Sequence, residues 1–436
     1  MKAVKAWGLP VALLLVVSFI VYALALSVFP LPPLVRDAYG YTMTSLRVLH
    51  DHVFSFGLQP PGSRVVPNDD VTPGYPLLLS AIYLVSRVSP ANPVAAITHV
   101  EPWIVFLQLL MGVGIVLMLY LCGRSLGGHR LGLVAGIAAT LYLPFAWASS
   151  TTLADQAGTV LFAIELWLAL ELCKPARRRT LPMAFCFGLL VATTDMMRPA
   201  LALWPFVPIT YMLVRRLEPF RRVVLLLACG ALGFALVFAP WWVRSAAIAG
   251  RFVPIRTNVD IAKPVDFPGG PVRLTSTPPI PDYPVVLRPW TIEQATPART
   301  HAGETAISVA NPWVPQLADV WEDVYEPGIE RIGFAQPSTY NPYALATLVA
   351  LMTIYQRVLV GAAIIGMALV VRSRRLLLAA TVPLYVIAIH YNIQLTIRYF
   401  YPAMPAVVLL ASCAAFVGAT LLGRQFSRWG RWLAAE

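Results

Sequence analysis

The chain alternates between long apolar runs and short polar connectors. A helix needs roughly 20 apolar residues to cross about 30 Å of hydrocarbon, and ten runs approach or exceed that length. The predicted spans are 8–30, 101–122, 130–148, 156–173, 181–197, 199–214, 223–243, 345–371, 376–394 and 401–422. The pattern therefore predicts an all-α polytopic membrane protein with about ten transmembrane helices.

Two long segments interrupt this series of spans. Segment 31–100 contains an apolar stretch that is short for a crossing and has acidic loop before it, which predicts a helix lying at the outer interface within a structured first outer loop. Segment 245–344 is rich in proline and has little periodic apolar pattern, which predicts a loosely folded outer loop. The expected organisation is an N-terminal transmembrane module (1–244), the outer loop between spans seven and eight, and C-terminal helices with a short tail (345–436).

The basic connectors predict how the helices are oriented. They run from Arg124 to Arg130, from Lys174 to Arg179, from Arg215 to Arg222 and from Arg372 to Arg375, and the tail adds Arg424, Arg428 and Arg431. With the N-terminus inside, every one of them falls on the cytoplasmic side, as the positive-inside rule requires. We therefore expect an inner-membrane protein with both ends in the cytoplasm. The first apolar run is longer than a signal-peptide core, so we expect a retained span.

Composition agrees with a membrane protein. The 436 residues are 58% hydrophobic and 12% charged, whereas soluble domains carry about 25% charged residues. The net charge of +12 could suggest a nucleic-acid partner, but the basic residues lie in short connectors between apolar runs. The five cysteines lie inside apolar runs or at their cytoplasmic ends, which argues against a disulfide framework.

Two acidic residues lie where the predicted spans meet the outer surface. Asp37 follows the first span, and Asp155 opens the fourth span from the outside. A carboxylate at the boundary between membrane and water can act as a general base on a hydroxyl or an amine. Each carboxylate could instead cap the helix that follows it. The sequence alone leaves both interpretations open.

Three arginines, Arg198, Arg244 and Arg398, also fall at the outer face and run against the positive-inside bias. The planar guanidinium suits the oxygens of a phosphate, although such side chains can also reach out to lipid headgroups. Glu165 and Arg357 fall inside spans, where ionisable groups usually pair or line a cavity.

Motifs of soluble catalysis are absent from the sequence. There is no Gly-rich phosphate loop, no nucleophile elbow and no Cys/His metal spacing. His50 and His52 form the one close histidine pair, but alternate residues on a helix point apart. We therefore assign no metal ligands or cofactor, and leave a requirement for a divalent cation open.

Several short motifs together resemble one family. They are Asp37-Ala-Tyr39 after the first span, Thr72-Pro-Gly-Tyr75-Pro76, Asp155 at the fourth span, Arg198-Pro199, Pro240-Trp-Trp-Val-Arg244 and Arg398-Tyr-Phe-Tyr-Pro402. In order and side, this set resembles the GT-C glycosyltransferases, in particular the branch of protein O-mannosyltransferases and aminoarabinose transferases. The matches run from about residue 8 to 415. The chain has Ala38 where several members carry a second acid.

The resemblance implies an inverting membrane glycosyltransferase that moves a sugar from a polyprenyl-phosphate donor to a lipid, glycan or protein acceptor at the outer face. It implies catalytic roles for Asp37 and Asp155. The residues expected to hold the donor phosphate are Arg198, Arg244 and Arg398, and those expected to contact substrate from the first outer loop are Asp69, Asp70 and Tyr75.

Two other classes of function remain open. A transporter or lipid flippase would use charged groups near mid-membrane, and Glu165 and Arg357 point that way. A non-catalytic envelope assembly protein would not need acids and arginines gathered at one face. Convergence of Asp37, Asp155 and Arg398 on one site would favour the enzyme.

Overall fold

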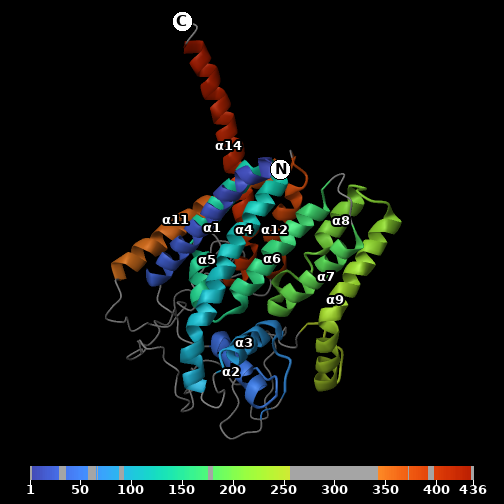
Figure 1. Cartoon of the computed structure of the whole chain (residues 1–436). Helices are drawn as coiled ribbons and strands as arrows, with labels where there is room; N and C mark the ends of the chain where they lie inside the picture. Colours follow the sequence, from blue (N-terminus) through green and yellow to red (C-terminus); the bar gives the residue numbers. More distant parts are fainter. Residues whose placement is uncertain are drawn as a thin grey trace, which may run out of the picture.

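The computed structural model describes residues 2–28, 36–56, 65, 67–87, 93–174, 180–255, 342–371, 373–390 and 397–433. Within these ranges the secondary structure is helical and contains no strand, which confirms the all-α class. Long helices pack side by side as a bundle, and two short helices lie together at one end of it (Figure 1). Of the predicted outer loop 245–344, residues 256–341 lie outside the described residues, so the prediction of a loosely folded segment there is untested.

The elements follow one another along the chain in this order. They are α1 (Lys2–Val28), α2 (Arg36–His50), α3 (Gly74–Val85), α4 (Pro93–Leu141), α5 (Pro144–Trp147), η1 (Ala148–Ser150), α6 (Ala154–Leu172), α7 (Leu181–Met197), η2 (Pro199–Leu201), α8 (Phe206–Val214), α9 (Phe220–Ala249), α11 (Pro342–Ala368), η3 (Leu369–Val371), α12 (Leu376–His390), α13 (Ile397–Phe400), η4 (Tyr401–Ala403) and α14 (Met404–Leu433). Each predicted span overlaps a helix of this series.

Helix α4 folds back on itself at a pair of glycines. Gly127 has φ −144° and Gly128 has φ 81°, a left-handed value that favours glycine over residues with a Cβ atom. The two halves then pack together, and the Tyr120 hydroxyl lies 2.7 Å from Nδ1 of His129. The second and third predicted spans are therefore the two arms of this hairpin, with the basic connector at its turn.

A second sharp turn separates α7 from η2 and α8. The two helical stretches, Leu181–Met197 and Pro199–Val214, are bent by 115°. Proline disfavours the helical conformation in the residue before it, and Arg198 accordingly adopts the extended φ −157° and ψ 105°. The sequence Arg198-Pro199 thus ends one helix and places an arginine at the corner.

The number of spans remains a prediction. Five helices are long and apolar enough to cross a membrane: Gly8–Val28, His99–Leu141, Phe220–Ala249, Thr347–Ala368 and Arg398–Leu421. The bent pair of α7 and α8 adds a sixth if it is one span. A multi-pass membrane protein is confirmed by these helices. The count of ten needs α4 to count twice, and it also needs the shorter or more polar helices to cross.

Two apolar cores hold the bundle and the short helices. In the main core, the buried rings of Phe162 and Trp204 meet edge to face at 5.1 Å. A smaller core joins α2, α3 and the first turns of α4 through Tyr75, Leu79 and Ile104. This second core shows that the described part of segment 31–100 is structured, as predicted.

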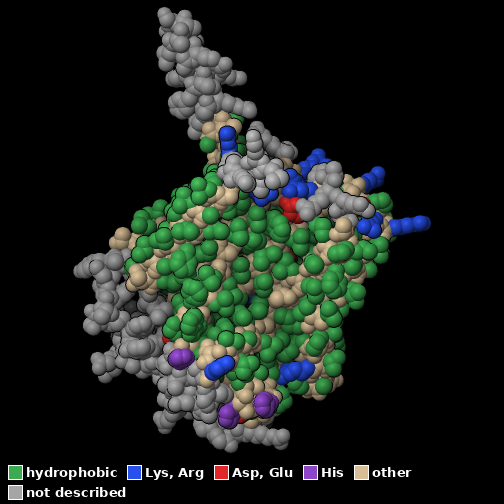
Figure 2. Space-filling model, viewed as in Figure 1, with side chains coloured by type: hydrophobic (Ala, Val, Ile, Leu, Met, Phe, Trp, Pro, Cys, Tyr) green, Lys and Arg blue, Asp and Glu red, His purple; other side chains and the backbone are tan. Residues whose placement is uncertain are grey.

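On the face that Figure 2 shows, the side chains follow the pattern that a bilayer requires. Hydrophobic groups cover the visible flank of the bundle, and Lys and Arg gather at the end where α8 joins α9, away from α2 and α3 (Figure 2). Transmembrane helices present apolar side chains to lipid and collect basic ones in their cytoplasmic connectors. The assignment of the basic end to the cytoplasm stays a prediction.

Candidate active site

Asp155 lies at the centre of a charged cluster and does not cap its helix. The cap of α6 is Leu153, whose side chain makes no capping bond, and Asp155 stands in the first turn. Its carboxylate forms an ion pair with Nη1 of Arg198 and lies 3.2 Å from Nε of Arg398. The Asp155 side chain is completely buried. The helix N-terminus favours a negative charge at this position, and the two guanidinium groups balance it.

Arg198 reaches this cluster from the corner between α7 and η2. Gly158 on α6 permits the approach, because a Cβ atom at that position would lie 2.8 Å from Cβ of Arg198. The guanidinium Nη2 also donates a hydrogen bond of 3.1 Å to the backbone carbonyl of Arg398. Arg198 therefore ties the end of α7 to both α6 and α13.

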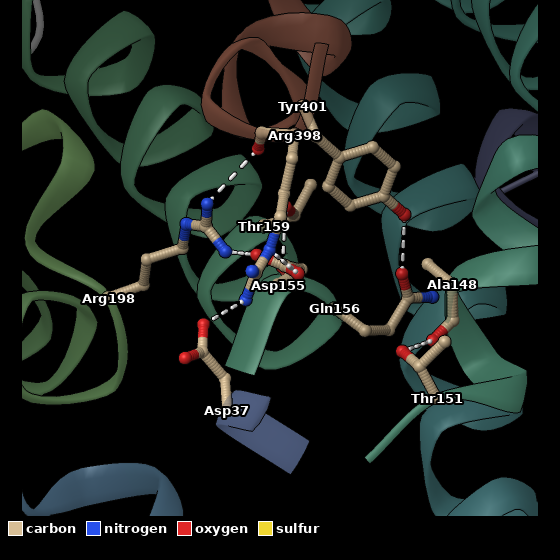
Figure 3. A network of polar contacts seen from close by, with 9 residues as sticks. All are labelled: Asp37, Ala148, Thr151, Asp155, Gln156, Thr159, Arg198, Arg398 and Tyr401. Carbon is tan, nitrogen blue, oxygen red and sulfur yellow. Dashed lines mark hydrogen bonds and ion pairs between the residues drawn. The ribbon is translucent and has the colours of Figure 1, made fainter. Parts of the chain in front are cut away.

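Arg398 connects the buried carboxylate to an accessible one. Its Nη2 lies 2.9 Å from Oδ2 of Asp37, in the first turn of α2. The exposed fraction of the Asp37 side chain is 43%, and that of Arg398 is 32%. Figure 3 shows Asp37, Asp155, Arg198 and Arg398 pointing toward one another from four separate elements. Four of the five residues predicted for catalysis or phosphate binding thus meet in one place.

The cluster combines two kinds of group. Asp37 offers a carboxylate that solvent can reach. Arg198 and Arg398 offer guanidinium N–H groups that point in fixed directions, since each side chain forms an ion pair with Asp155. A buried charge of this kind is stable only while its partners remain in place.

A neutral network beside Asp155 was missed by the sequence analysis. The Tyr401 hydroxyl donates to Oε1 of Gln156 at 2.6 Å (Figure 3). Nε2 of Gln156 donates to the carbonyl of Phe145 at 3.0 Å. Nε2 also lies 3.3 Å from the carbonyl of Gln108 on α4. Buried amides are almost always hydrogen-bonded, so a glutamine inside an apolar run was the available signal.

Arg244 takes part in a different set of contacts. Its Nη2 donates to the carbonyls of Phe54 and Asn68 at 2.8 and 3.0 Å, and its guanidinium lies over the rings of Phe54 and Trp241. Asp69 is near enough to act on it electrostatically. Arg244 therefore fastens the described part of the first outer loop to α9. Its assignment to the donor phosphate stays a prediction.

The three loop candidates occupy interior or partly buried positions. Tyr75 is buried in the core of α2 and α3, with its ring 5.3 Å from that of Tyr41, and burial raises its pKa well above the ordinary value. Asp69 is buried, and Asp70 is half-buried. Their predicted contacts with substrate are not tested by this arrangement.

The two ionisable groups predicted inside spans lie in different surroundings. Glu165 is buried on α6, where Asp195 and Thr194 of α7 face it, whereas Arg357 is exposed on α11. Within the described ranges, no group of three or more His, Cys, Asp and Glu side chains could hold a metal ion.

Comparison with known proteins places the fold. No family model matches the chain, and no curated protein matches it. The crystal structure of ArnT from Cupriavidus metallidurans in the apo state matches 97% of this chain with a TM-score of 0.51 and 16% identity. This chain spans 63% of that protein's length. The crystal structure of the same ArnT bound to undecaprenyl phosphate gives a TM-score of 0.41 at 14% identity, over 93% of this chain and 76% of that one.

Structural similarity at 16% sequence identity shows a shared fold and does not show a shared activity. The chain therefore shares the fold of ArnT, in agreement with the resemblance carried by the sequence motifs.

Proposed function

We propose that this protein is an integral-membrane glycosyltransferase that moves a sugar from a polyprenyl-phosphate donor to an acceptor at the outer face of the membrane. The observation that carries the proposal is the meeting of Asp37, Asp155, Arg198 and Arg398 at the end of the bundle that bears α2. The fold shared with ArnT supports it.

The proposed reaction is a single displacement at the anomeric carbon. A hydroxyl or amine of the acceptor attacks that carbon, the bond between it and the phosphate oxygen breaks, and polyprenyl phosphate leaves with the electron pair. Asp37 accepts the proton that the nucleophile loses. Arg398 and Arg198 stabilise the negative charge that grows on the departing phosphate. Attack from the face opposite the phosphate inverts the configuration.

Asp155 has a positioning role in this mechanism. Its carboxylate is buried and is already paired with Arg198 and Arg398. It therefore orients the two guanidinium groups and does not receive the acceptor's proton. The free site keeps Asp37 paired with Arg398. A donor phosphate competes with Asp37 for that guanidinium, and binding of the donor thereby releases the base toward the acceptor.

A transporter is the second candidate, and one observation favours it. Glu165 and Asp195 are buried close together between α6 and α7, and paired acids inside a membrane often relay protons. Replacing both by Gln and Asn would stop transport but leave sugar transfer measurable, so assays of the same reconstituted variant separate the two functions.

The direct test uses purified protein in liposomes with labelled polyprenyl-phosphate sugars. Lipid, glycan and protein acceptors are supplied in parallel, and movement of label to one of them is the expected result. Failure to bind any polyprenyl-phosphate sugar would contradict the proposal. Product analysis by NMR reports the anomeric configuration and tests inversion.

Binding of the sugar donor should weaken when the guanidinium group of Arg198 or Arg398 is replaced by an ammonium group. Arg198→Lys and Arg398→Lys keep the charge but lose the planar fork. A hydrogen bond to a charged group contributes about 1.5–3 kcal/mol, so the donor KM should rise roughly tenfold to a hundredfold. Arg251→Lys is the control, because Arg251 is exposed just beyond α9 and outside the cluster. Unchanged donor KM in both cluster variants would reassign them to anchoring at lipid headgroups.

The orientation can be tested by labelling single cysteines in a background without the five native ones. Cysteine at Ser63 or Ser276, both in predicted outer segments, should react with an impermeant reagent in intact cells. Cysteine at Ser373, next to α12 at the basic end, should be protected. Reaction at Ser373 in intact cells would overturn the topology and the outer-face mechanism together.

A further inference from the structure

A second site candidate lies at the basic end of the bundle, away from the acid–arginine cluster. A cavity of about 710 Å³ opens between α8 and α12. Its walls are mainly apolar, and Phe206, Val214 and Leu377 remain 58%, 74% and 42% exposed. Since α8 and α12 belong to predicted spans, we expect the cavity to be a groove that opens to lipid.

Two arginines mark the end of this groove. Arg215 follows the last turn of α8, and Arg374 precedes α12, and both side chains line the cavity. Lys and Arg gather on the surface where α8 joins α9 (Figure 2), and Arg215 is the residue that directly follows α8. The groove thus has an apolar body and a cationic mouth.

Further cations reinforce the positive field at the mouth. Arg375 acts electrostatically on Tyr211, which also lines the groove. Burial lowers the pKa of Lys174, and the neighbouring charges of Arg375 and Arg124 lower it further. The positive charge of Lys174 is balanced by Glu171, with which it forms an ion pair.

The arginines at the mouth keep positive charge that no acid of the described residues neutralises through an ion pair. In the part of the chain that the structure describes, no carboxylate forms an ion pair with Arg215, Arg374 or Arg375. Nη1 of Arg375 is buried and has no hydrogen-bond partner there.

We infer that this groove binds an anionic phospholipid, with its phosphate on Arg215 and Arg374 and an acyl chain along Phe206, Val214 and Leu377. An apolar groove alone would accept any lipid tail, and the cations select a negatively charged headgroup. Basic pockets between transmembrane helices recognise anionic headgroups in this way. The inference is independent of the proposed glycosyltransferase function, because it concerns the opposite end of the bundle.

Native mass spectrometry of the delipidated full chain in detergent tests the inference. Phosphatidylglycerol and phosphatidylcholine with the same acyl chains are offered at equal concentration. The wild-type protein should bind phosphatidylglycerol in preference. A basic residue near a membrane surface contributes about fivefold to attraction of anionic lipid, so Arg215→Gln/Arg374→Gln should weaken phosphatidylglycerol binding roughly 25-fold. Binding of phosphatidylcholine should not change.

Two controls separate this site from general attraction to positive charge. Arg130→Gln/Arg221→Gln removes two exposed charges from the same end without touching the groove, and it should keep the preference. Thr210→Trp keeps the arginines but fills the groove from an exposed position on α8, and it should lose bound lipid. Thermal unfolding confirms that each variant is folded.

Three results would overturn the inference. They are an unchanged phosphatidylglycerol preference in Arg215→Gln/Arg374→Gln, an equal loss in the Arg130/Arg221 pair, and displacement of the lipid by inorganic phosphate at millimolar concentration. The last result would show a phosphate pocket in place of a lipid site.

Discussion

Asp155→Asn is expected to destabilise the protein by about 3–5 kcal/mol and to abolish sugar transfer, because breaking a buried ion pair leaves its partner charged and uncompensated. The Asp155 side chain is fully buried and that of Arg198 is 11% exposed, so water cannot replace the lost carboxylate charge. Arg398 loses the same anchor. One substitution therefore disturbs both proposed phosphate ligands.

Thermal unfolding in detergent measures the effect on stability, and a double-mutant cycle assigns it. In Asp155→Asn/Arg198→Met both charges of the pair are gone, so the double variant should be more stable than the sum of the single losses predicts, by about 0.5–3 kcal/mol. Asp51→Asn is the matched control, because Asp51 forms an exposed ion pair with His50, and such pairs contribute at most about 1 kcal/mol. Additive losses in the cycle would show that Asp155 and Arg198 act independently.

Much of the fold follows from the lengths and ends of apolar runs. The predicted breaks at 122–130 and at Arg198 coincide with the glycine turn of α4 and with the corner before Pro199. Both breaks have local causes, a residue that tolerates positive φ and a proline, which a sequence displays directly. How many helices cross the bilayer depends on packing between helices, and hydropathy does not encode that packing.

The site was predicted as separate residues and not as an arrangement. Asp37, Asp155, Arg198 and Arg398 each stood out because a charge at the end of an apolar run needs a partner or water. Their pairing joins distant positions, since Asp155 and Arg398 are 243 residues apart and Asp37 and Arg398 are farther apart still, and no periodicity carries that information. Arg244 shares the chemistry of the other two arginines, yet the structure places it against the carbonyls of Phe54 and Asn68. Gln156 escaped notice because it is neutral.

Asp37→Asn should slow transfer roughly a hundredfold or more while leaving the protein folded. Asparagine keeps the size of the side chain and can still accept a hydrogen bond from Arg398, but it cannot take up a proton. A general base contributes typically about 10²–10⁴-fold to rate. The ion pair with Arg398 is 43% exposed on the aspartate side, so its loss should cost at most about 1 kcal/mol of stability.

Donor affinity distinguishes a base from a structural residue at this position. Because Asp37 competes with the donor phosphate for Arg398 in the proposed mechanism, Asp37→Asn should bind donor at least as tightly as the wild-type protein, with the loss confined to kcat. Single-turnover transfer and equilibrium donor binding measure the two quantities on the same reconstituted sample, and Asp51→Asn should change neither. Transfer at close to the wild-type rate would make Asp37 a structural residue at the start of α2 and move the search for the base to Asp69 and Asp70, two further acids of the first outer loop.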